Sequence, residues 1–141
     1  MEFIVLTVIM TMNHTKRLDF KKIKTIAIVG LSDKPDRPSY KVGKYLLEKG
    51  FKIFPINPNI KEVFGLKSYP NLISINQLID VVDIFRKSEF VEAIVDEAIK
   101  IGAKIIWMQE GVINENAATK ARSAGLTVVM NMCMMKAHKK C

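Results

Sequence analysis

The sequence predicts an α/β domain, a three-layer sandwich in which helices cover both faces of a mostly parallel sheet of five or six strands. Two observations predict this class. Short apolar runs alternate with stretches of helical period, and a glycine stands at the end of each helical stretch. Strands that alternate with helices form right-handed βαβ crossovers, and these give a parallel sheet whose ligands bind at the carboxyl ends of the strands.

The first strand and helix occupy residues 25 to 50. Thr25 to Val29 is a continuous apolar run that ends at Gly30, which is typical of a central strand buried on both faces. Ser39 is expected as the N-cap of the helix, because its hydroxyl can accept from free N–H groups of the first turn. The helical period is then carried to the stop at Gly50 by Val42, Tyr45, Leu46 and Lys49.

The second strand is predicted at Phe51 to Ile56, and it is closed by Asn57-Pro58-Asn59. Residues 60 to 79 contain turn residues and only short apolar groups. We expect a brief strand near 67 to 69 and one or two helical turns near 74 to 79.

The second half of the chain again alternates predicted strands with predicted helices. Val81 to Phe85 is expected as a strand, and Ser88 as the cap of a helix that ends at Gly102. One face of that helix is formed by Val91, Ile94, Val95 and Ala98.

Lys104 to Met108 and Leu126 to Met130 are expected as the last two strands. Asn114 caps the helix between them, and Gly125 ends it. The small-residue face of this helix, which we consider as a homodimer contact, consists of Ala117, Ala118, Ala121 and Ala124.

The length of 141 residues fits one domain, expected at 23 to 135 with a basic tail at 136 to 141. Residues 1 to 22 are an extension. Its apolar run, Phe3 to Met12, is about half the length of a membrane helix, so no membrane partner is predicted. Glu2 and the polar residues after the run do not fit a signal peptide. A mispredicted start, with Met10 or Met12 as the true initiator, is one interpretation, and an arm or strand docked on the domain is the other.

The net charge of +8, from 22 Lys plus Arg against 14 Asp plus Glu, favours an anionic ligand. The basic residues form no block longer than two and no run studded with aromatic residues, which argues against a nucleic-acid partner. The two cysteines, Cys133 and Cys141, have neither metal-ligand spacing nor a disulfide framework, so we expect a reducing, cytoplasmic location.

The turn after the first strand predicts a phosphate cradle. An NAD site would show G-x-G-x-x-G and an acidic residue about 20 residues later. Gly30 is instead followed by Leu31-Ser32, the next glycine is Gly43, and the second strand ends in Asn57 with Lys61 nearby, so both marks are missing. Cations in and after this loop, suited to several phosphates, are Lys34, Arg37 and Lys41.

A series of motifs then carries a resemblance over residues 22 to 135. The sequence resembles the stand-alone bacterial and archaeal CoA-binding proteins, a family similar to the N-terminal CoA-binding domain of the succinyl-CoA synthetase α subunit and of ADP-forming acyl-CoA synthetases. The motifs are Gly30-Leu31-Ser32, Arg37-Pro38-Ser39-Tyr40, Ile56-Asn57-Pro58, Phe64-Gly65 with Tyr69-Pro70, Val82-Asp83-Ile84-Phe85-Arg86, Trp107-Met108-Gln109 with Gly111, and Cys133.

The resemblance implies a Rossmann-like fold that binds coenzyme A or an acyl-CoA. The diphosphate and 3′-phosphate would lie on the loop through Tyr40, the adenosine at Asn57 and Pro58, and the pantetheine along Arg86 and Gln109. The complete set of implied ligand residues is Gly30, Leu31, Ser32, Lys34, Arg37, Ser39, Tyr40, Asn57, Pro58, Arg86, Gln109 and Gly111.

The chain departs from the family pattern at two places. Leu31 stands where the turn commonly has alanine, and we expect it to add bulk near the ligand. Asn131-Met132 replaces the usual pair before Cys133. For Arg86, a surface ion pair with Asp83 or Glu89 is the alternative to ligand contact, and Trp107 and the methionines are expected as core residues.

No catalytic or metal-ligating residues are predicted. The histidines, His14 and His138, stand in terminal segments, and no Ser/His/Asp or paired-carboxylate arrangement can be placed at the cradle with a histidine as base. The sequence therefore predicts a small CoA-binding module without a reaction of its own. The alternatives are an NAD(P)-dependent or acyl-CoA-using enzyme on the same cradle and a CoA-sensing regulatory or scaffold protein.

Overall fold

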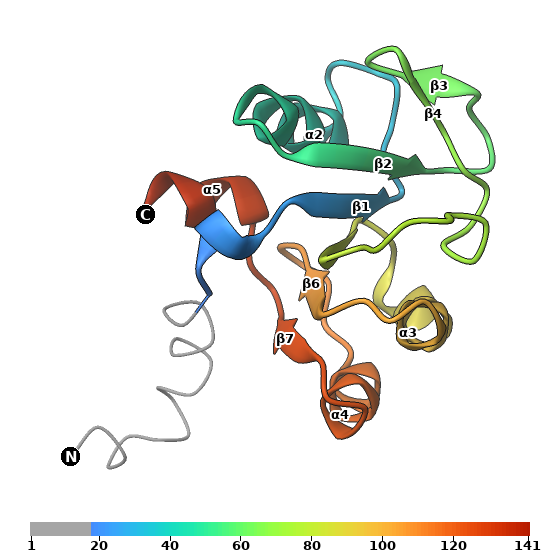
Figure 1. Ribbon diagram of the computed structural model, residues 1–141, viewed down its shortest axis with the longest axis vertical. Coiled ribbons are helices and arrows are strands. Elements are labelled where there is room, and N and C mark those ends of the chain that lie inside the picture. The colour runs from blue at the N-terminus through green and yellow to red at the C-terminus, as the bar shows by residue number, and fades with distance from the viewer. Residues whose placement is uncertain (1–17) are drawn as a thin grey trace.

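The computed structural model describes residues 18–141 (Figure 1). The two interpretations of the chain start and the position of His14 concern residues outside this range. Within it, no helix is long and apolar enough to cross a membrane.

Five parallel strands form the central sheet, in the order β2-β1-β5-β6-β7. Their bounds are Thr25–Val29 for β1, Lys52–Ile56 for β2, Val81–Ile84 for β5, Ile105–Met108 for β6 and Thr127–Val129 for β7. The next strand of this sheet along the chain is β5, and it lies on the other side of β1 from β2. The winding direction of the chain therefore reverses between β1 and β5. This confirms the predicted α/β class with a parallel sheet.

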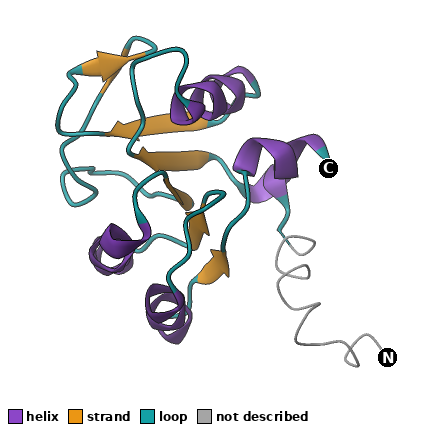
Figure 2. Ribbon diagram, turned by 180° about the vertical axis from the view of Figure 1, so that it is seen from behind, coloured by secondary structure: helices purple, strands orange, loops and turns teal. Residues whose placement is uncertain are grey.

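Two helices cover each face of the sheet (Figures 1 and 2). One layer contains α2 (Pro38–Glu48) and α5 (Met134–Lys139), and the other contains α3 (Val91–Lys100) and α4 (Glu115–Ser123). Alternate residues of the strands supply the two hydrophobic cores, so that Ile28 faces α2 and α5 while Val29 faces α3 and α4. Burial on both faces explains why the strands are continuous apolar runs.

Short elements complete the chain. The 3₁₀ turn η1 (Phe20–Lys22) precedes β1, and its Phe20 is buried against the layer of α2 and α5. The strands β3 (Glu62–Val63) and β4 (Leu66–Lys67) form an antiparallel hairpin near the predicted brief strand. A second 3₁₀ turn, η2 (Ser88–Phe90), leads into α3.

Both predicted serine caps are wrong. The N-cap of α2 is Arg37, because Pro38 takes the first helical position and places Ser39 inside the helix. Ser88 lies in η2, so α3 begins only at Val91. By contrast, Asn114 caps α4 as predicted, since its side chain accepts from the Ala117 N–H.

No helix forms at 74 to 79, where helical turns were expected. The segment follows a turn in which Ser74 N donates to Asn71 Oδ1 and Ser74 Oγ donates to the Asn71 carbonyl. Its path is fixed by the burial of Leu72, Ile75 and Ile79 against the sheet. The apolar residues at 72, 75 and 79 therefore anchor an irregular segment to the sheet and do not form a helix face.

The C-terminal residues, predicted as a basic tail from 136, form most of α5. Ala137 is buried, and His138 lies between α2 and η1, so hydrophobic packing holds this short helix on the sheet. The alanine face of α4 is also accounted for within the chain. Ala117, Ala118 and Ala121 are fully buried in the core with α3, so they are not available as a dimer contact.

Candidate functional site

The candidate site lies at the carboxyl edge of the sheet, where the winding direction reverses. The glycine turn after β1 meets the end of β5 there, and Gly30 has φ of +88°. A Cβ placed on Gly30 would lie 2.5 Å from the Phe85 carbonyl oxygen and 3.2 Å from Arg86 Cδ. Gly30 is required both for its backbone conformation and for this close approach.

Side chains hold the loop between β1 and α2 in one shape. Ser39 Oγ accepts from the Ser32 N–H at 2.9 Å, and Ser32 Oγ accepts from the Lys34 N–H at 3.0 Å. The Gly30 N–H donates to the Ile56 carbonyl at 2.8 Å. Ser39 is buried, whereas Lys34 and Arg37 are exposed. The loop is thus preorganised by its small polar residues and presents its cations to solvent.

Asn57 ties this loop to the end of β2. Its Nδ2 donates to the Leu31 carbonyl at 2.9 Å, and its Oδ1 accepts from the Asn59 N–H. Leu31 itself is fully buried in the core beneath α2. The prediction that Leu31 adds bulk at the ligand is therefore wrong, because its side chain points away from the loop surface.

The first turn of α2 offers free donors. The Lys41 N–H is the first to bond within the helix, to the Arg37 carbonyl at 3.2 Å. No hydrogen bond is formed by the N–H groups of Ser39 and Tyr40 within the described chain. Free N–H groups at a helix N-terminus favour an anion, and Arg37 and Lys41 stand exposed beside them. The predicted cradle thus combines free donors with cations.

A cavity of about 450 Å³ opens between the N-terminal turns of α2 and α5. Its walls are largely apolar, with a few polar groups at one side. The lining residues are Pro38, Lys41, Val42, Phe85, Gln109, Glu110, Val112, Cys133, Met135 and Lys136. A concave apolar space of this size with few polar groups is the usual form of a small-molecule site.

Polar contacts fix the rim of this cavity. Gln109 is 4% exposed, and its Oε1 accepts from the Met134 N–H at 3.0 Å, which holds the start of α5. Lys136 forms an exposed ion pair with Glu110 at 3.2 Å. Cys133 is buried at the N-cap of α5, and its thiol is not in a disulfide.

Arg86 lies across the cradle without an ion pair to Asp83 or Glu89. Its side chain passes close to Gly30, and its guanidinium stacks on the Phe90 ring, 4.5 Å from the centroid. Arg86 is exposed and follows the end of β5. It lies beside the Gly30 turn, and its role as a ligand residue stays a prediction.

Other predicted residues do not line the main cavity, although Gly111 stands between its lining residues Glu110 and Val112. Pro58 and Asn57 line a separate hollow of about 360 Å³ with Lys61 and Lys67. The Gly111 N–H is bonded to Asn131 Oδ1 at 2.8 Å, and the Tyr40 ring packs on Phe64 at 4.7 Å.

Of the twelve predicted residues, only Gln109 lines the main cavity. The sequence reasoning missed its apolar walls, which are Val42, Phe85, Val112 and Met135. Apolar residues next to strand ends and on helices are indistinguishable from core residues in a single sequence. Val112 alone could have been identified, because it directly follows the predicted site residues Gln109 and Gly111 in the sequence.

Asp83 is a buried acidic residue of β5, in the central sheet. It is fully buried between Ile28 of β1 and Trp107 of β6, and neither carboxyl oxygen has a hydrogen-bond partner among residues 18–141. Burial therefore raises the pKa of Asp83 well above its ordinary value. Trp107 is a core residue, as predicted, and its Nε1 donates to the Met132 carbonyl at 2.7 Å.

Comparison with known proteins decides the family. Residues 24–139 match the family described as CoA binding domain. The chain belongs to this CoA-binding family. The domain is 38% identical to the uncharacterized protein YneT of Bacillus subtilis over 131 residues, which are 90% of this chain and 97% of that protein. The resemblance drawn from the sequence motifs is thereby confirmed.

The domain is also similar to parts of larger enzymes. It is 33% identical over 81 residues to the ADP-forming acetate–CoA ligase of Methanocaldococcus jannaschii, a match to 57% of this chain but only 12% of the ligase. A hypothetical protein from Pyrococcus horikoshii OT3 has a similar structure, with a TM-score of 0.85, 42% identity, and coverage of 92% of this chain and 90% of that one.

A second solved structure links the fold to a synthetase. The dinucleotide-forming acetyl-coenzyme A synthetase 1 of Ca. Korarchaeum cryptofilum matches with a TM-score of 0.70 and 28% identity, over 81% of this chain and 28% of that one. The CoA-binding domain is thus Rossmann-like in structure and occurs both alone and within synthetases.

Proposed function

We propose that this chain binds coenzyme A or an acyl-CoA at the carboxyl edge of its sheet, as a cytoplasmic module without a reaction of its own. The observation that carries the proposal is a juxtaposition. The free N–H groups of Ser39 and Tyr40 stand at the start of α2, and the same helix turn supplies Pro38, Lys41 and Val42 to the 450 Å³ cavity.

The two parts of coenzyme A fit the two parts of the site. Its phosphates would contact the free N–H groups of α2 and the exposed cations Arg37 and Lys41. Its pantetheine arm, which is mostly apolar with two amides, would lie in the cavity against Phe85 and Val112. The thiol or thioester end would then point toward Cys133 and Gln109.

The absence of a reaction is proposed from the side chains at the cavity. The described histidine, His138, lies on the last turn of α5, at the end of the helix away from Cys133. Glu110 is engaged by Lys136, and residues 18–141 hold no cluster of metal-ligating side chains. No base is therefore positioned to activate Cys133, which is 5% exposed.

A thermal-shift panel tests the proposal, because a ligand at about 100 times its Kd adds roughly 2.7 kcal/mol to the free energy of unfolding. We expect coenzyme A and acetyl-CoA to raise Tm, and 3′-dephospho-CoA to raise it less. A shift with NAD or NADP alone would instead support a redox enzyme. Release of free thiol from acetyl-CoA on incubation would contradict the absence of a reaction.

A further inference from the structure

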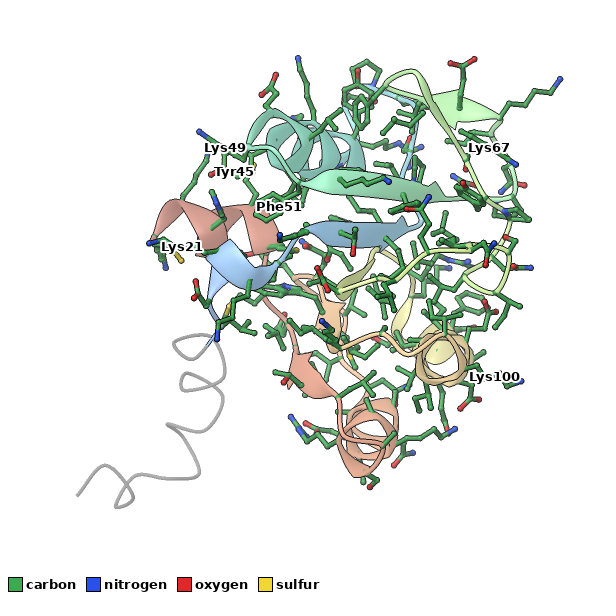
Figure 3. All side chains as sticks on the ribbon, viewed as in Figure 1. Lys21, Tyr45, Lys49, Phe51, Lys67 and Lys100 are labelled. Carbon is green, nitrogen blue, oxygen red and sulfur yellow. The ribbon has the colours of Figure 1, made fainter. Side chains whose placement is uncertain are left out.

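A group of exposed lysines gathers at the edge of the molecule opposite the cavity. We define the basic surface as the exposed residues Lys21, Lys49, Lys139 and Lys140. They come from η1 and from the C-terminal ends of α2 and α5, so they are dispersed in the sequence but brought together by the fold. Figure 3 shows Lys21 and Lys49 on the side of the molecule where η1 and α5 lie, whereas Lys67 and Lys100 lie far from them.

Tyr45 and His138 hold the segments of the basic surface together. The ammonium groups of Lys49 and Lys139 lie 5.4 Å and 5.3 Å from the centroid of the same Tyr45 ring. The Tyr45 hydroxyl forms a 2.7 Å hydrogen bond with His138 Nδ1. The His138 ring packs edge-on against Phe20 at 5.1 Å, next to Lys21. The lysines are therefore carried on a packed aromatic support.

The cations of the basic surface are not neutralised within the described chain. None of these four lysines has a carboxylate within ion-pair distance in residues 18–141. The exposed carboxylates nearest to them in sequence are those of Asp19 and Glu48. Lysines at helix C-termini complement the helix dipole, which accounts for Lys49, Lys139 and Lys140 but not for Lys21. Four lysines against two carboxylates leave the surface with excess positive charge.

The chemistry of the basic surface selects its partner. A stable protein interface has an apolar centre, and stable membrane docking combines basic charge with inserted apolar side chains. The exposed large hydrophobic residues of the described chain lie in other segments, at Ile73, Leu78, Phe90 and Ile113. The surface consists of lysines without the Arg, Asn or Gln that read bases, and lysine is a point charge suited to phosphate.

We propose that the basic surface binds the phosphate backbone of nucleic acid without sequence preference. The partner is held by charge alone, so binding is strongly dependent on salt. This surface lies at the opposite end of α2 and α5 from the cavity, and the proposal is independent of coenzyme A binding.

Fluorescence anisotropy of a fluorescein-labelled single-stranded RNA of mixed sequence, titrated with the full chain, tests the proposal. The variant is K49Q/K139Q. The control, K67Q/K100Q, is matched in charge and in surroundings, because Lys67 lies over the Tyr69 ring and Lys100 occupies the last turn of α3. We expect K49Q/K139Q to weaken binding about fivefold or more and to lower the salt slope by about 1.4. The control should change affinity less than twofold.

Equal losses in both double variants would overturn the proposal, because net charge and not the basic surface would then decide binding. Binding that does not weaken between about 50 and 200 mM salt would also overturn it. The same holds if phosphatidylserine vesicles bind and RNA does not. An unchanged Tm in both variants shows that the comparison concerns folded protein.

Discussion

The hydroxyl of Ser39 accepts a 2.9 Å hydrogen bond from the Ser32 N–H, across the loop that joins β1 to α2. Ser39 is buried, so Ser39→Ala leaves the Ser32 N–H without its partner. We expect a loss of about 1 kcal/mol in the free energy of unfolding and weaker coenzyme A binding, because the loop loses its fixed shape. Urea denaturation and calorimetry measure the two effects.

Ser74→Ala is the matched control for that prediction. Ser74 Oγ also bonds within its own loop, to the Asn71 carbonyl at 2.8 Å, but it is exposed and remote from the site. Coenzyme A affinity should be unchanged in this variant. Equal losses of affinity in both would contradict a specific role for the loop.

Gly30→Ala should be far more destabilising than Gly65→Ala. Both glycines have positive φ, +88° and +74°, so each alanine incurs the cost of a left-handed backbone, about 1 kcal/mol. Only at Gly30 would the added Cβ collide with backbone, 2.5 Å from the Phe85 oxygen, whereas at Gly65 it meets nothing. The difference between the two melting temperatures isolates the collision. Equal Tm values would show that β1 and β5 do not approach so closely.

Asp83→Asn should raise stability by an amount that grows with pH. The folded pKa of Asp83 is raised by burial, so its contribution to stability is fully present below the unfolded pKa and is lost as pH rises through the folded value. Asparagine keeps the shape of the neutral acid and does not ionise on unfolding. Urea denaturation of both proteins at about pH 4 and pH 7 checks this. A difference that does not vary with pH would contradict a buried neutral Asp83.

The stability that Asp80 contributes should depend on pH in the opposite direction to that of Asp83. Burial opposes ionisation of Asp80, but the Lys24 and Thr25 N–H groups and the Lys104 ammonium together lower its pKa. Its stabilisation is present above the unfolded pKa and is lost as pH falls through the folded value. Asp80→Ala should therefore cost about 2 kcal/mol at neutral pH and less in acid. Replacement of Lys104, whose side chain is 68% exposed, by Gln should lower the free energy of unfolding only slightly.

Local patterns predicted much of the fold. The apolar run Thr25–Val29 with its glycine matches β1 residue for residue, and Asn114 caps α4 as expected. Both depend on neighbouring residues only. Ser88 failed as a cap because its hydroxyl accepts from the Ile113 N–H, a contact with a segment 25 residues away. Such long-range competition is not visible in the residues around Ser88.

The site could be predicted only in part. Glycine, serine and lysine in the turn after β1 predict a phosphate cradle, because glycine lets the backbone approach a phosphate and hydroxyl and ammonium groups can donate to it. The cavity walls depend on α5, and the basic run Lys136 to Lys140 concealed that this segment buries Met134 and Ala137. The basic surface likewise depends on tertiary packing, since its lysines are separated by up to 119 residues in the sequence, and the prediction against a nucleic-acid partner considered only runs of adjacent basic residues.

Calorimetric titration of coenzyme A into the full chain, with Lys41→Glu and Lys100→Glu as paired variants, tests the central claim most directly. Lys41 lines the main cavity at α2, whereas Lys100 occupies the last turn of α3 in the other helical layer. We predict one bound coenzyme A per chain, at least tenfold weaker binding in Lys41→Glu, and little change in Lys100→Glu. No heat of binding in the unmodified chain, or a loss confined to Lys100→Glu, would contradict a coenzyme A site at this cavity.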